Sequence, residues 1–489
     1  MKRFISILLA IVMAALCAVP SFAGYAPAKT QEAQREKLPL VIIRGMDADD
    51  LIVDYGNGKT GPPVMPVNTS DIVKTLFKAA GTSLIRLSAD KGLDVVTGYA
   101  KKILGSMACD KTGTPICKAA IPTYPLAVSN YGNLLNSTDY SEGQIVKSSI
   151  DHFGADYTYY FAYDWRLNPF DNCGRIAALV DQALSDTGCS KVNLVCASLG
   201  GIQTLAYLTK YGYEKLNKIV FVSSASCGSY FATDLFNGNL STSPEVLYNA
   251  LAGDPGNDEA AAFMLKALYK TGAFNGVSWF ADSILNRLKA KIYNDVLIEE
   301  MGYIPAYWAL VLPEGYDGAI DYMFGDDLAG NAEFIALTAE LQKLAAGRNA
   351  LLLKAAAAGV GISVIAGYNS GSVPVGKWGG SNGDGTLETA LMAGGAKAAK
   401  FGKTLGDNYT VADPACLSPD RIVDTSGCLF PASTWLIKDG PHVGCRAGSE
   451  YSGFLLWLLD FDGQPTVASN PEYPRFMQTN DNQDLSPLQ

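Results

Sequence analysis

Short apolar runs bounded by turn-forming residues recur along the chain and predict buried β-strands. The clearest runs are Leu38–Ile43, Tyr157–Tyr163, Val192–Ala197, Lys218–Val222 and Ile362–Ala366. Apolar residues at helical spacing flank the third run, at Ile176, Leu179, Val180 and Leu184 before it and at Ile202, Leu205, Ala206 and Leu208 after it. Strands alternating with helices are typical of a parallel sheet covered on both faces, so the pattern predicts an α/β fold.

The stretch 231–357 has a different pattern. It is rich in Ala and Leu, lacks strand-like runs, and carries helical periods at Met264, Leu265 and Leu268 and at Phe334, Leu337, Leu341 and Leu344. We therefore expect a helical insertion between a first half of the sheet domain, 38–230, and a second half, 358–489. The polar tail Asp481–Gln489 is expected to fray.

The N-terminus has the composition of a secretory signal peptide, which would comprise residues 1–23. Lys2 and Arg3 precede the apolar stretch Phe4–Val19, and Ser21-Phe22-Ala23 fits a small-x-small cleavage site. A membrane anchor is the alternative, but the stretch is short for a span and Pro20 interrupts it. The sequence therefore predicts a secreted or extracytoplasmic protein.

Composition narrows the class of protein. Of 489 residues, 48% are hydrophobic and 18% charged, which is enough apolar material for a large core. The net charge of -10 argues against binding to nucleic acid or to an anionic membrane through a basic surface. The chain has two histidines, His152 and His442, so a mechanism that needs an imidazole base must use one of them.

Nine cysteines remain after the predicted cleavage, and an exported chain with that many is expected to form disulfides. The close pairs in loop-like sequence are Cys109–Cys117, Cys173–Cys189 and Cys416–Cys428, whereas Cys196 ends an apolar strand and is our candidate for a buried thiol. Zinc is a rival interpretation, but no C-x-x-C pair occurs. The acidic stretch Asp47–Asp50 could hold calcium, although a solvated turn is the simpler interpretation. We expect no metal or organic cofactor.

The strongest chemical signal is the run Cys196-Ala197-Ser198-Leu199-Gly200-Gly201 at the end of a predicted strand. A serine between small residues at a strand-to-helix turn is typical of a nucleophile elbow, in which a sharp turn exposes the hydroxyl. Gly200 fits this pattern, and Cys196 stands where glycine is usual. Ser198 is therefore the candidate nucleophile, with an ordinary serine in a turn as the alternative.

A serine hydroxyl needs a base to accept its proton, and in the hydrolase sheet fold the chain order is serine, acid, histidine. His442 is the one histidine after Ser198 and follows an apolar run and a glycine-rich loop, which makes it the candidate base. Asp384, in Gly383-Asp384-Gly385-Thr386, is the candidate acid that would orient the imidazole. The alternatives are a surface histidine, an ordinary Asp-Gly turn, and a different acid among Asp407, Asp413 and Asp424. His152 is interpreted as structural.

The oxyanion hole requires two amides near the nucleophile. Leu199 would supply one at the start of the helix that follows the elbow. The loop after the first strand, Arg44-Gly45-Met46-Asp47, would supply the other, with Met46 as the first choice and Asp47 as the next. Met46 in a purely packing role is the alternative.

Together these segments resemble the lecithin:cholesterol acyltransferase family of α/β-hydrolases. The most specific match is Tyr163-Asp164-Trp165-Arg166-Leu167-Asn168-Pro169, close to that family's Y-D-W-R-L-x-P. Further matches are the strand and glycine loop at Val41–Met46, the elbow at Ala197–Gly201, the acid motif at Gly383–Leu387 and a looser lid-like segment at Ile304–Pro313, so the resemblance spans Leu38 to His442. Ala197 departs from the family, which has histidine before the nucleophile.

The resemblance implies an α/β-hydrolase fold with a helical cap or lid over 231–357. It implies Ser198, Asp384 and His442 as the catalytic triad and Met46 and Leu199 as the oxyanion hole. Asp164 and Arg166 are interpreted as a structural pair and Trp165 as packing. In the insertion, Trp279, Phe280, Leu285, Tyr307, Trp308, Leu310 and Leu312 would form either the lining of an acyl pocket or the core of the cap itself.

The expected function is that of an exported serine hydrolase or acyltransferase acting on acyl esters, with lipid or phospholipid esters as the expected substrates. Transient contact of the cap with a lipid surface is expected, and no nucleic-acid partner. A small-ester or polyester esterase with the same triad is one alternative. A catalytically inactive hydrolase-fold binding protein is the other. The sequence leaves open the headgroup, the chain length, hydrolysis against acyl transfer, and the oligomeric state.

Overall fold

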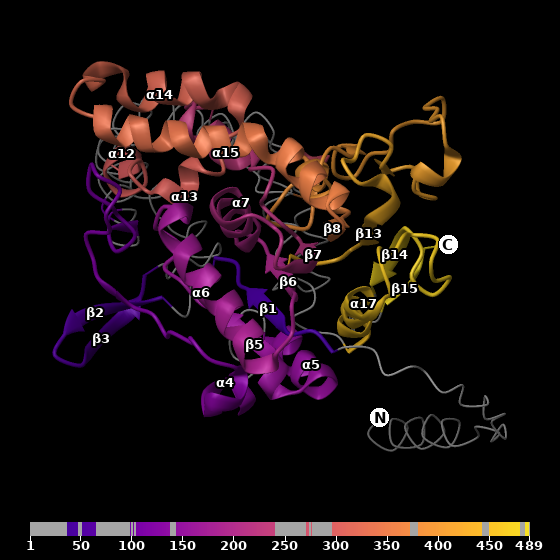
Figure 1. The fold of residues 1–489 in the computed structure, drawn as a ribbon. Helices are drawn as coiled ribbons and strands as arrows, with labels where there is room; N and C mark the ends of the chain where they lie inside the picture. Colours follow the sequence, from indigo (N-terminus) through magenta and orange to yellow (C-terminus); the bar gives the residue numbers. More distant parts are fainter. Residues whose placement is uncertain are drawn as a thin grey trace, which may run out of the picture. The chain divides into compact units, whose positions relative to one another are not determined.

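One mostly parallel sheet of eight strands forms the centre of the protein (Figure 1). The computed structural model describes residues 37–46, 51–64, 98, 101, 104–136, 143–239, 270–272, 275, 296–371, 380–442, 449–479 and 485–488. The sheet strands are β1 (Leu40–Ile43), β5 (Thr158–Phe161), β6 (Val192–Ala197), β7 (Leu216–Val222), β8 (Gly361–Tyr368), β13 (Thr434–Lys438), β14 (Phe476–Thr479) and β15 (Leu485–Pro487). Their order is β15-β14-β13-β8-β7-β6-β1-β5, and only β15 runs antiparallel to its neighbour. The predicted α/β class is therefore confirmed.

The two faces of the sheet bury alternate residues of each strand, as the period of two in a β-strand requires. In β6, Leu194 and Cys196 belong to one buried cluster, and Val195 and Ala197 belong to the other. All six residues of β6 are buried, which explains why five of them are apolar; the predicted bounds of this strand are confirmed.

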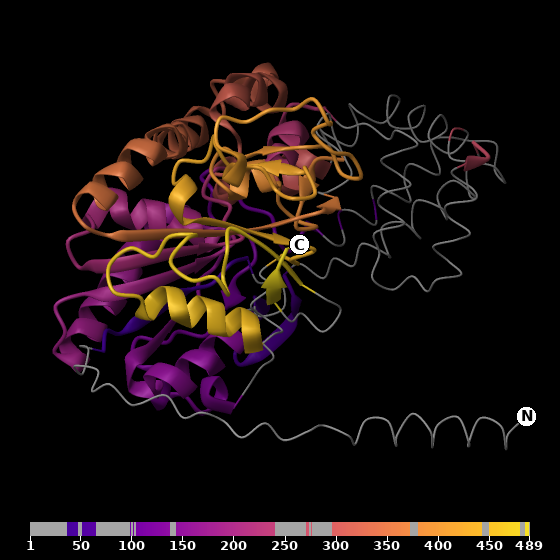
Figure 2. The same ribbon diagram turned by 90° about the vertical axis from the view of Figure 1, so that its right-hand side faces the viewer.

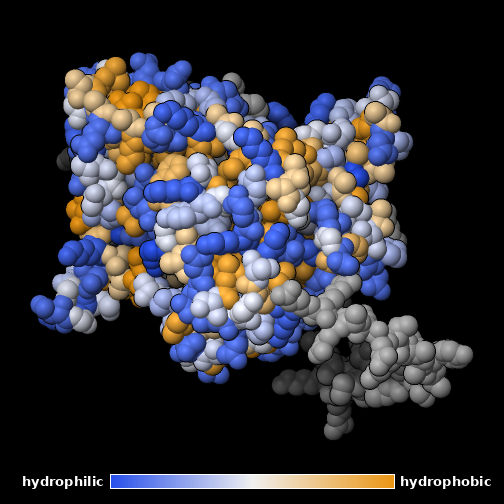
Figure 3. Space-filling view, viewed as in Figure 1, coloured by the Kyte–Doolittle hydropathy of each residue, from blue (hydrophilic) through white to orange (hydrophobic). Residues whose placement is uncertain are grey.

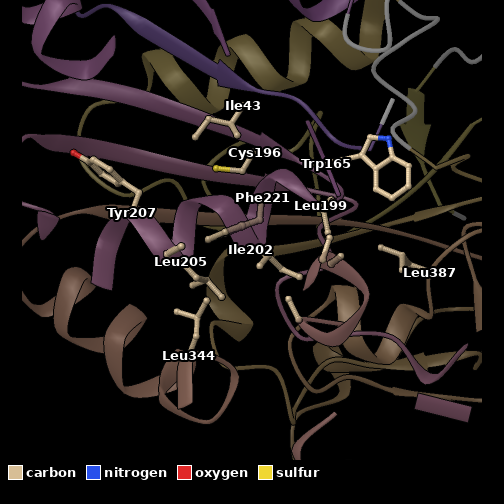
Figure 4. Packing of buried hydrophobic residues seen from close by; sticks show 14 of the residues in the cluster. Ile43, Trp165, Cys196, Leu199, Ile202, Leu205, Tyr207, Phe221, Leu344 and Leu387 are labelled. Atoms are coloured by element: carbon tan, nitrogen blue, oxygen red, sulfur yellow. The ribbon is translucent and has the colours of Figure 1, made fainter. Parts of the chain in front are cut away.

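Helices cover both faces (Figures 1 and 2). The helices that pack on the sheet are α5 (Gly143–Phe153) and α17 (Ser449–Asp460) on one face and α6 (Pro169–Thr187) and α7 (Gly200–Tyr211) on the other. Local signals set the ends of α6: the Asn168 side chain accepts the Phe170 N–H at 3.0 Å, Pro169 is the first helical residue, and Gly188 ends the helix at a φ of +70°. Figure 4 shows Cys196 and Phe221 of the sheet packed against Ile202 and Leu205 of α7.

The described elements between β7 and β8 are helical. They are α8 (Tyr230–Phe236), α12 (Ile298–Glu300), α13 (Pro305–Trp308), η4 (Pro313–Gly315), α14 (Tyr316–Phe324), η5 (Gly325–Asp327) and α15 (Ala332–Ala357). Trp308 is fully buried, stacks on Phe324 at 5.5 Å between ring centroids, and donates its indole N–H to the Gly302 carbonyl at 2.7 Å. Trp308 is therefore part of the core of this helical segment. Trp279, Phe280 and Leu285 lie outside the described residues.

Helix α15 packs on α7 rather than directly on the sheet, so it forms a third layer on that side (Figure 1). Leu344 of α15 lies on the side of α7 away from the sheet (Figure 4). On the outer surface of α14 and α15, hydrophobic and hydrophilic side chains are interspersed (Figure 3). Tyr322 and Leu353 are exposed.

Shorter elements connect the sheet strands. The hairpin β2 (Ile52–Gly56) and β3 (Lys59–Pro63) pairs with β4 (Ala119–Ala120), and η1 (Val128–Asn130), α4 (Gly132–Asn136) and η2 (Ala155–Tyr157) precede β5. After β8 the chain forms β9 (Ser370–Gly371), β10 (Asn382–Gly383), α16 (Thr389–Met392), β11 (Lys397–Ala398), η6 (Pro414–Cys416), β12 (Val423–Asp424) and η7 (Pro431–Ser433).

One expectation from the sequence is wrong: the tail does not fray over its described part, because Leu485–Pro487 pairs with β14 as the edge strand of the sheet. Among the described cysteines, Cys109, Cys117, Cys173, Cys416 and Cys428 are free in the structure. The expected disulfides stay a prediction, except for the pair Cys173–Cys189. Cys173 lies near the start of α6 and Cys189 just beyond its end. Their separation along the helix is about 20 Å, against about 6 Å between the Cα atoms of a disulfide.

The predicted signal peptide and the acidic stretch Asp47–Asp50 lie outside the described residues. Among the helices that the structure does describe, none combines the length and the apolar character needed to cross a membrane.

Candidate active site

Ser198 occupies a strained turn between β6 and α7. Its φ angle is +49°, in the left-handed region that residues with a side chain rarely adopt. The Ser198 N–H donates to the Val222 carbonyl at 3.0 Å, and the Ser198 carbonyl accepts from the amides of Gly201 at 3.1 Å and Ala225 at 2.9 Å. Strain of this kind costs about 1–3 kcal/mol and persists only where neighbouring contacts enforce it. The backbone thus has the sharp turn that presents a serine hydroxyl at the end of a strand.

The two glycines after the turn allow α7 to approach the neighbouring strands. A Cβ atom on Gly200 would lie 2.5 Å from the Ile43 carbonyl oxygen and 2.7 Å from the Arg44 carbonyl oxygen. A Cβ atom on Gly201 would collide with the side chain of Ser224. Both contacts involve atoms of adjacent strand ends, so any larger residue would push the helix away from the sheet.

Cys196 fits the position where glycine is usual because its side chain points into the interface between strand and helix. It is fully buried, and its sulfur lies 2.9 Å from the Thr204 hydroxyl, which in turn lies 2.9 Å from the Gly200 carbonyl. Burial raises the pKa of the Cys196 thiol to about 12, so the group stays protonated and unreactive. The prediction of a buried thiol at this position is confirmed.

Ala197 is also fully buried, in the cluster on the α5 and α17 face of the sheet. Its side chain therefore points away from the turn that carries Ser198.

The structure brings the three predicted site residues together in one hydrogen-bonded line. His442 Nε2 lies 2.9 Å from Ser198 Oγ, and His442 Nδ1 lies 2.7 Å from Asp384 Oδ2. An ionised carboxylate can only accept, so Nδ1 carries the ring proton and Nε2 is left to accept the serine proton. The arrangement is that of a serine with a positioned base and an acid that orients the base.

Asp384 is fixed by a tight loop after β8. Its Oδ1 accepts the backbone N–H groups of Thr386 at 3.0 Å and Leu387 at 2.9 Å, which leaves Oδ2 for His442. Close packing fixes the loop as well, since a Cβ atom on Gly367 of β8 would lie 2.7 Å from the Asp384 Cβ. The Asp384 side chain is fully buried, whereas that of His442 is 20% exposed, so the base but not the acid is open to a substrate.

The loop after β13 places His442 beside Asp384. Asp439 adopts a left-handed φ of +56° and donates its N–H to the Tyr368 carbonyl at 2.9 Å, which ties the ends of β8 and β13 together. The His442 N–H then donates to the Asp384 carbonyl at 3.1 Å. Backbone and side chain of the histidine are thus both held by Asp384.

The rival acids have other partners. Asp413 caps η6 by accepting the Ala415 N–H at 3.0 Å, and Asp424 accepts the Tyr409 hydroxyl at 2.6 Å. The Asp407 carbonyl accepts from Arg421 at 3.1 Å. None of the three contacts His442 among the interactions of the described residues.

The candidate oxyanion donors lie next to Ser198. A Cβ atom on Gly45 would lie 2.8 Å from the Ser198 Cβ and 3.4 Å from its Oγ, so the loop that continues to Met46 packs directly on the serine. Leu199 immediately precedes α7 as its N-cap residue, at the end of the helix where N–H groups have no acceptor within the helix. Within the described part of the chain, the amides of Met46 and Leu199 donate to no acceptor. Asp47 lies outside the described residues.

The segment Tyr163–Arg166 joins loops at the end of β5. Arg166 forms a buried two-point ion pair with Asp164, at 3.0 and 2.7 Å, and donates to the Ser106 carbonyl at 2.9 Å. The Tyr163 hydroxyl donates to the Arg44 carbonyl at 3.1 Å. Trp165 is fully buried, and its ring centroid lies 5.9 Å from that of Tyr307 of α13. These contacts hold the strand ends together, and none of them involves the Ser198 hydroxyl.

His152 lies elsewhere, on α5, where it pairs with Asp460 and packs edge-on against Phe153 at 4.7 Å between ring centroids.

Two cavities of about 330 and 320 Å³ are present, one beside Asn168 and Lys210 and one beside Tyr124 and Arg175. Neither is lined by the three site residues, so the expected acyl tunnel stays a prediction.

Sequence reasoning missed Glu388, a buried acid at the end of the Asp384 loop. It is 2% exposed, and its carboxylate accepts from the Tyr230 N–H at 3.3 Å and the Ser229 hydroxyl at 3.4 Å. Burial raises its pKa to about 7, and the nearby charge of Asp384 adds to the effect. The partners precede Glu388 by more than 150 positions, so no local pattern could have revealed them.

No protein-family model matches this chain, and no curated protein matches it. A solved structure described as "The crystal structure of Tle4-Tli4 complex" is similar over 68% of this chain and 75% of that chain, with 10% sequence identity and a TM-score of 0.27. A TM-score this low does not establish a shared fold.

Proposed function

We propose that this protein is a serine hydrolase or acyltransferase of the α/β-hydrolase fold that acts on acyl esters. The observation that carries the proposal is the line from Asp384 through His442 to Ser198, with separations of 2.7 and 2.9 Å. The strained backbone of Ser198 is the second support, because strain of this kind clusters at functional sites.

The strand order supports the hydrolase fold. The serine follows β6, the acid follows β8 and the histidine follows β13, and these strands are parallel with β7 between the first two. Their carboxyl ends therefore meet at one edge of the sheet, where open α/β sheets bind ligands. The chain order serine, acid, histidine is that of the α/β-hydrolases.

The geometry supports a two-step reaction. Ser198 Oγ attacks the ester carbonyl carbon while His442 Nε2 takes the hydroxyl proton, and the amides of Leu199 and Met46 stabilise the oxyanion. The ester C–O bond breaks, His442 returns the proton to the leaving alcohol, and an acyl–Ser198 ester remains. Water or a second alcohol then attacks that ester with His442 again as base, which releases the acid or a new ester.

We further propose that the protein is related to the lecithin:cholesterol acyltransferase family and that its substrates are lipid or phospholipid esters. The support is the segment Tyr163–Pro169 and its packing between β5, β1 and α13. Export is proposed from the signal-peptide pattern of residues 1–23 alone. Contact of the helical insertion with a lipid surface is likewise proposed.

A fluorophosphonate probe tests the nucleophile. We expect the wild type to be labelled, Ser198→Ala to be unlabelled, and the exposed control Ser185→Ala on α6 to be labelled like the wild type. For the base, His442→Ala should lose nearly all turnover of p-nitrophenyl esters, and His152→Ala should retain it. Equal labelling of Ser198→Ala would refute the assignment.

Substrate class is decided by comparing short-chain and long-chain p-nitrophenyl esters and phospholipid vesicles. A preference for long chains supports the lipid proposal, and activity confined to short chains supports the small-ester alternative. Acyl transfer is tested by adding a long-chain alcohol. An ester product at the expense of free acid supports transfer, and an unchanged rate and product identify a hydrolase.

A further inference from the structure

The Asp384 loop ends at Glu388, whose backbone is fixed by hydrogen bonds to the loop and to the helix that follows it. Asp384 N–H donates to the Leu387 carbonyl at 3.1 Å, and Gly383 and Glu388 form an antiparallel bridge that closes the loop. The Glu388 carbonyl accepts from Leu391 at 3.1 Å and Met392 at 3.0 Å, so Glu388 also begins α16. A shift of Glu388 therefore moves the loop that carries the acid.

The Glu388 side chain reaches a different part of the molecule, the start of the helical insertion. Its Oε2 accepts the Tyr230 N–H and the Ser229 hydroxyl, and the Ser229 oxygen accepts the Phe231 N–H at 3.1 Å. These residues begin α8, the first helix after β7. Helix α8 is also hydrogen-bonded to the segment after α13. The Ser229 N–H donates to the Leu310 carbonyl at 2.8 Å, and the Thr233 hydroxyl accepts the Leu312 N–H at 2.9 Å.

Burial of an acid at position 388 is energetically unfavourable. Among the ion pairs of the described residues it has no lysine or arginine partner, although its side chain is almost completely buried. A buried carboxylate without a cation is stabilised only by hydrogen-bond donors, which are stronger partners for the ionised form than for the neutral one. A glutamine would accept the same hydrogen bonds without that cost, so packing alone does not explain an acid here.

We infer that Glu388 is a positioning residue, which in its ionised form fixes the Asp384 loop to the first helix of the insertion and so keeps Asp384 aligned with His442. The inference rests on the proposed hydrolase function and adds to it a means by which the insertion and the triad are coupled. When Glu388 is protonated, its bonds to Tyr230 and Ser229 weaken, and the acid loop and the insertion become less firmly joined.

The charged and titratable groups around Glu388 favour a proton change near pH 7. Asp384 faces Glu388 from its own loop, and its negative charge raises the Glu388 pKa further, beyond the effect of burial. Tyr230 faces it from α8, and Glu314 and Cys227 act on Tyr230 in turn. Arg348 of α15 lies near Cys227, and burial is the main cause of the raised Cys227 pKa.

Glu388→Gln in the full chain tests the inference, with the exposed Glu340→Gln of α15 as the matched control. We expect kcat on a p-nitrophenyl ester to fall about 10-fold with little change in KM, because a misplaced acid loop affects the reacting geometry more than binding. The acid limb of the wild-type kcat profile should involve one proton more than that of Glu388→Gln, namely the proton lost from Glu388. Glu340→Gln should match the wild type in both.

The outcomes separate this inference from the proposed function. If the wild type turns over ester and Glu388→Gln has the same kcat and pH profile, the positioning role is refuted and the hydrolase assignment stands. If the wild type is neither labelled by fluorophosphonate nor active, the proposed function fails first. Should Glu388→Gln not fold, Ser229→Ala decides, because it removes one donor to the carboxylate. A kcat reduced about threefold, with the acid limb moved to higher pH, supports the inference, and an unchanged profile refutes it.

Discussion

Replacing Asp384 with asparagine should abolish turnover while leaving the fold intact. Oδ1 of Asp384 accepts two backbone N–H groups, at 3.0 and 2.9 Å, and Oδ2 faces His442 Nδ1 at 2.7 Å. In the variant, the amide oxygen has to stay with the two backbone donors, because the amide nitrogen would oppose donor to donor. The amide NH₂ group then faces Nδ1, which can only accept from it.

The consequence is a change of tautomer. With Nδ1 accepting, the ring proton moves to Nε2, and His442 donates to the Ser198 hydroxyl instead of accepting its proton. Reversing the amide would avoid this tautomer but would set the amide nitrogen against the two backbone donors. Leaving the buried Leu387 N–H without an acceptor costs about 1–3 kcal/mol, so the unproductive orientation prevails. A tautomer error of this kind lowers kcat about 10⁴-fold, which corresponds to about 5 kcal/mol of transition-state stabilisation.

The assay compares kcat on a p-nitrophenyl ester for the wild type, Asp384→Asn and the control Asp424→Asn, with thermal unfolding measured for each. Asp424 is a buried acid of the same region that contacts Tyr409 and not His442. We expect Asp384→Asn to unfold within a few degrees of the wild type and Asp424→Asn to retain turnover. A folded Asp384→Asn enzyme with more than about a tenth of the wild-type kcat would refute the assigned role of Asp384.

Two further predictions concern stability. Gly200→Ala places a Cβ atom 2.5 Å from the Ile43 carbonyl oxygen and should destabilise the protein by about 1–3 kcal/mol in urea unfolding, whereas Gly347→Ala in α15, where a Cβ atom meets open space, should stabilise it by about 0.5–1 kcal/mol. Equal effects would show that the elbow is not closely packed. For Glu388, a folded pKa of about 7 lies above the ordinary value of 4.5, so the folded state binds the proton more tightly and loses up to about 3 kcal/mol of stability as pH rises from about 4.5 to 7. Glu388→Gln should lack this loss, and parallel unfolding-versus-pH curves for wild type and variant would contradict the burial of a titrating acid.

The parts of the fold that the sequence predicts are those with a local cause. Val192–Ala197 is buried on both faces, so its apolar run marks the strand at its true ends. The last two strands, β14 and the edge strand β15, are short and only partly buried, and their sequence gives no comparable signal. The predicted pairing of Cys173 with Cys189 failed because sequence proximity conceals a rigid helix between the two residues.

In the candidate site, too, the residues with a local sequence motif could be predicted and the one without such a motif could not. Ser198, Asp384 and His442 could be proposed because each lies in a short motif with its own turn chemistry, and the structure brings their side chains together. Glu388 has no such motif, and its burial depends on Ser229 and Tyr230, far away in the chain. Long-range packing, rather than local pattern, decides which acids are buried.

The wide separation of the site residues along the chain has a consequence for folding. Ser198 and His442 are 244 positions apart, and both sit at the ends of strands in the same sheet. Contacts of such high sequence separation form late, because the entropy of closing a long loop must be overcome first. Helices and single strand pairs can therefore assemble while the hydroxyl of Ser198 still lacks its base. On the proposed function, Ser198 gains its base only when β13 has docked beside β8, so an incompletely folded chain would carry an inert serine.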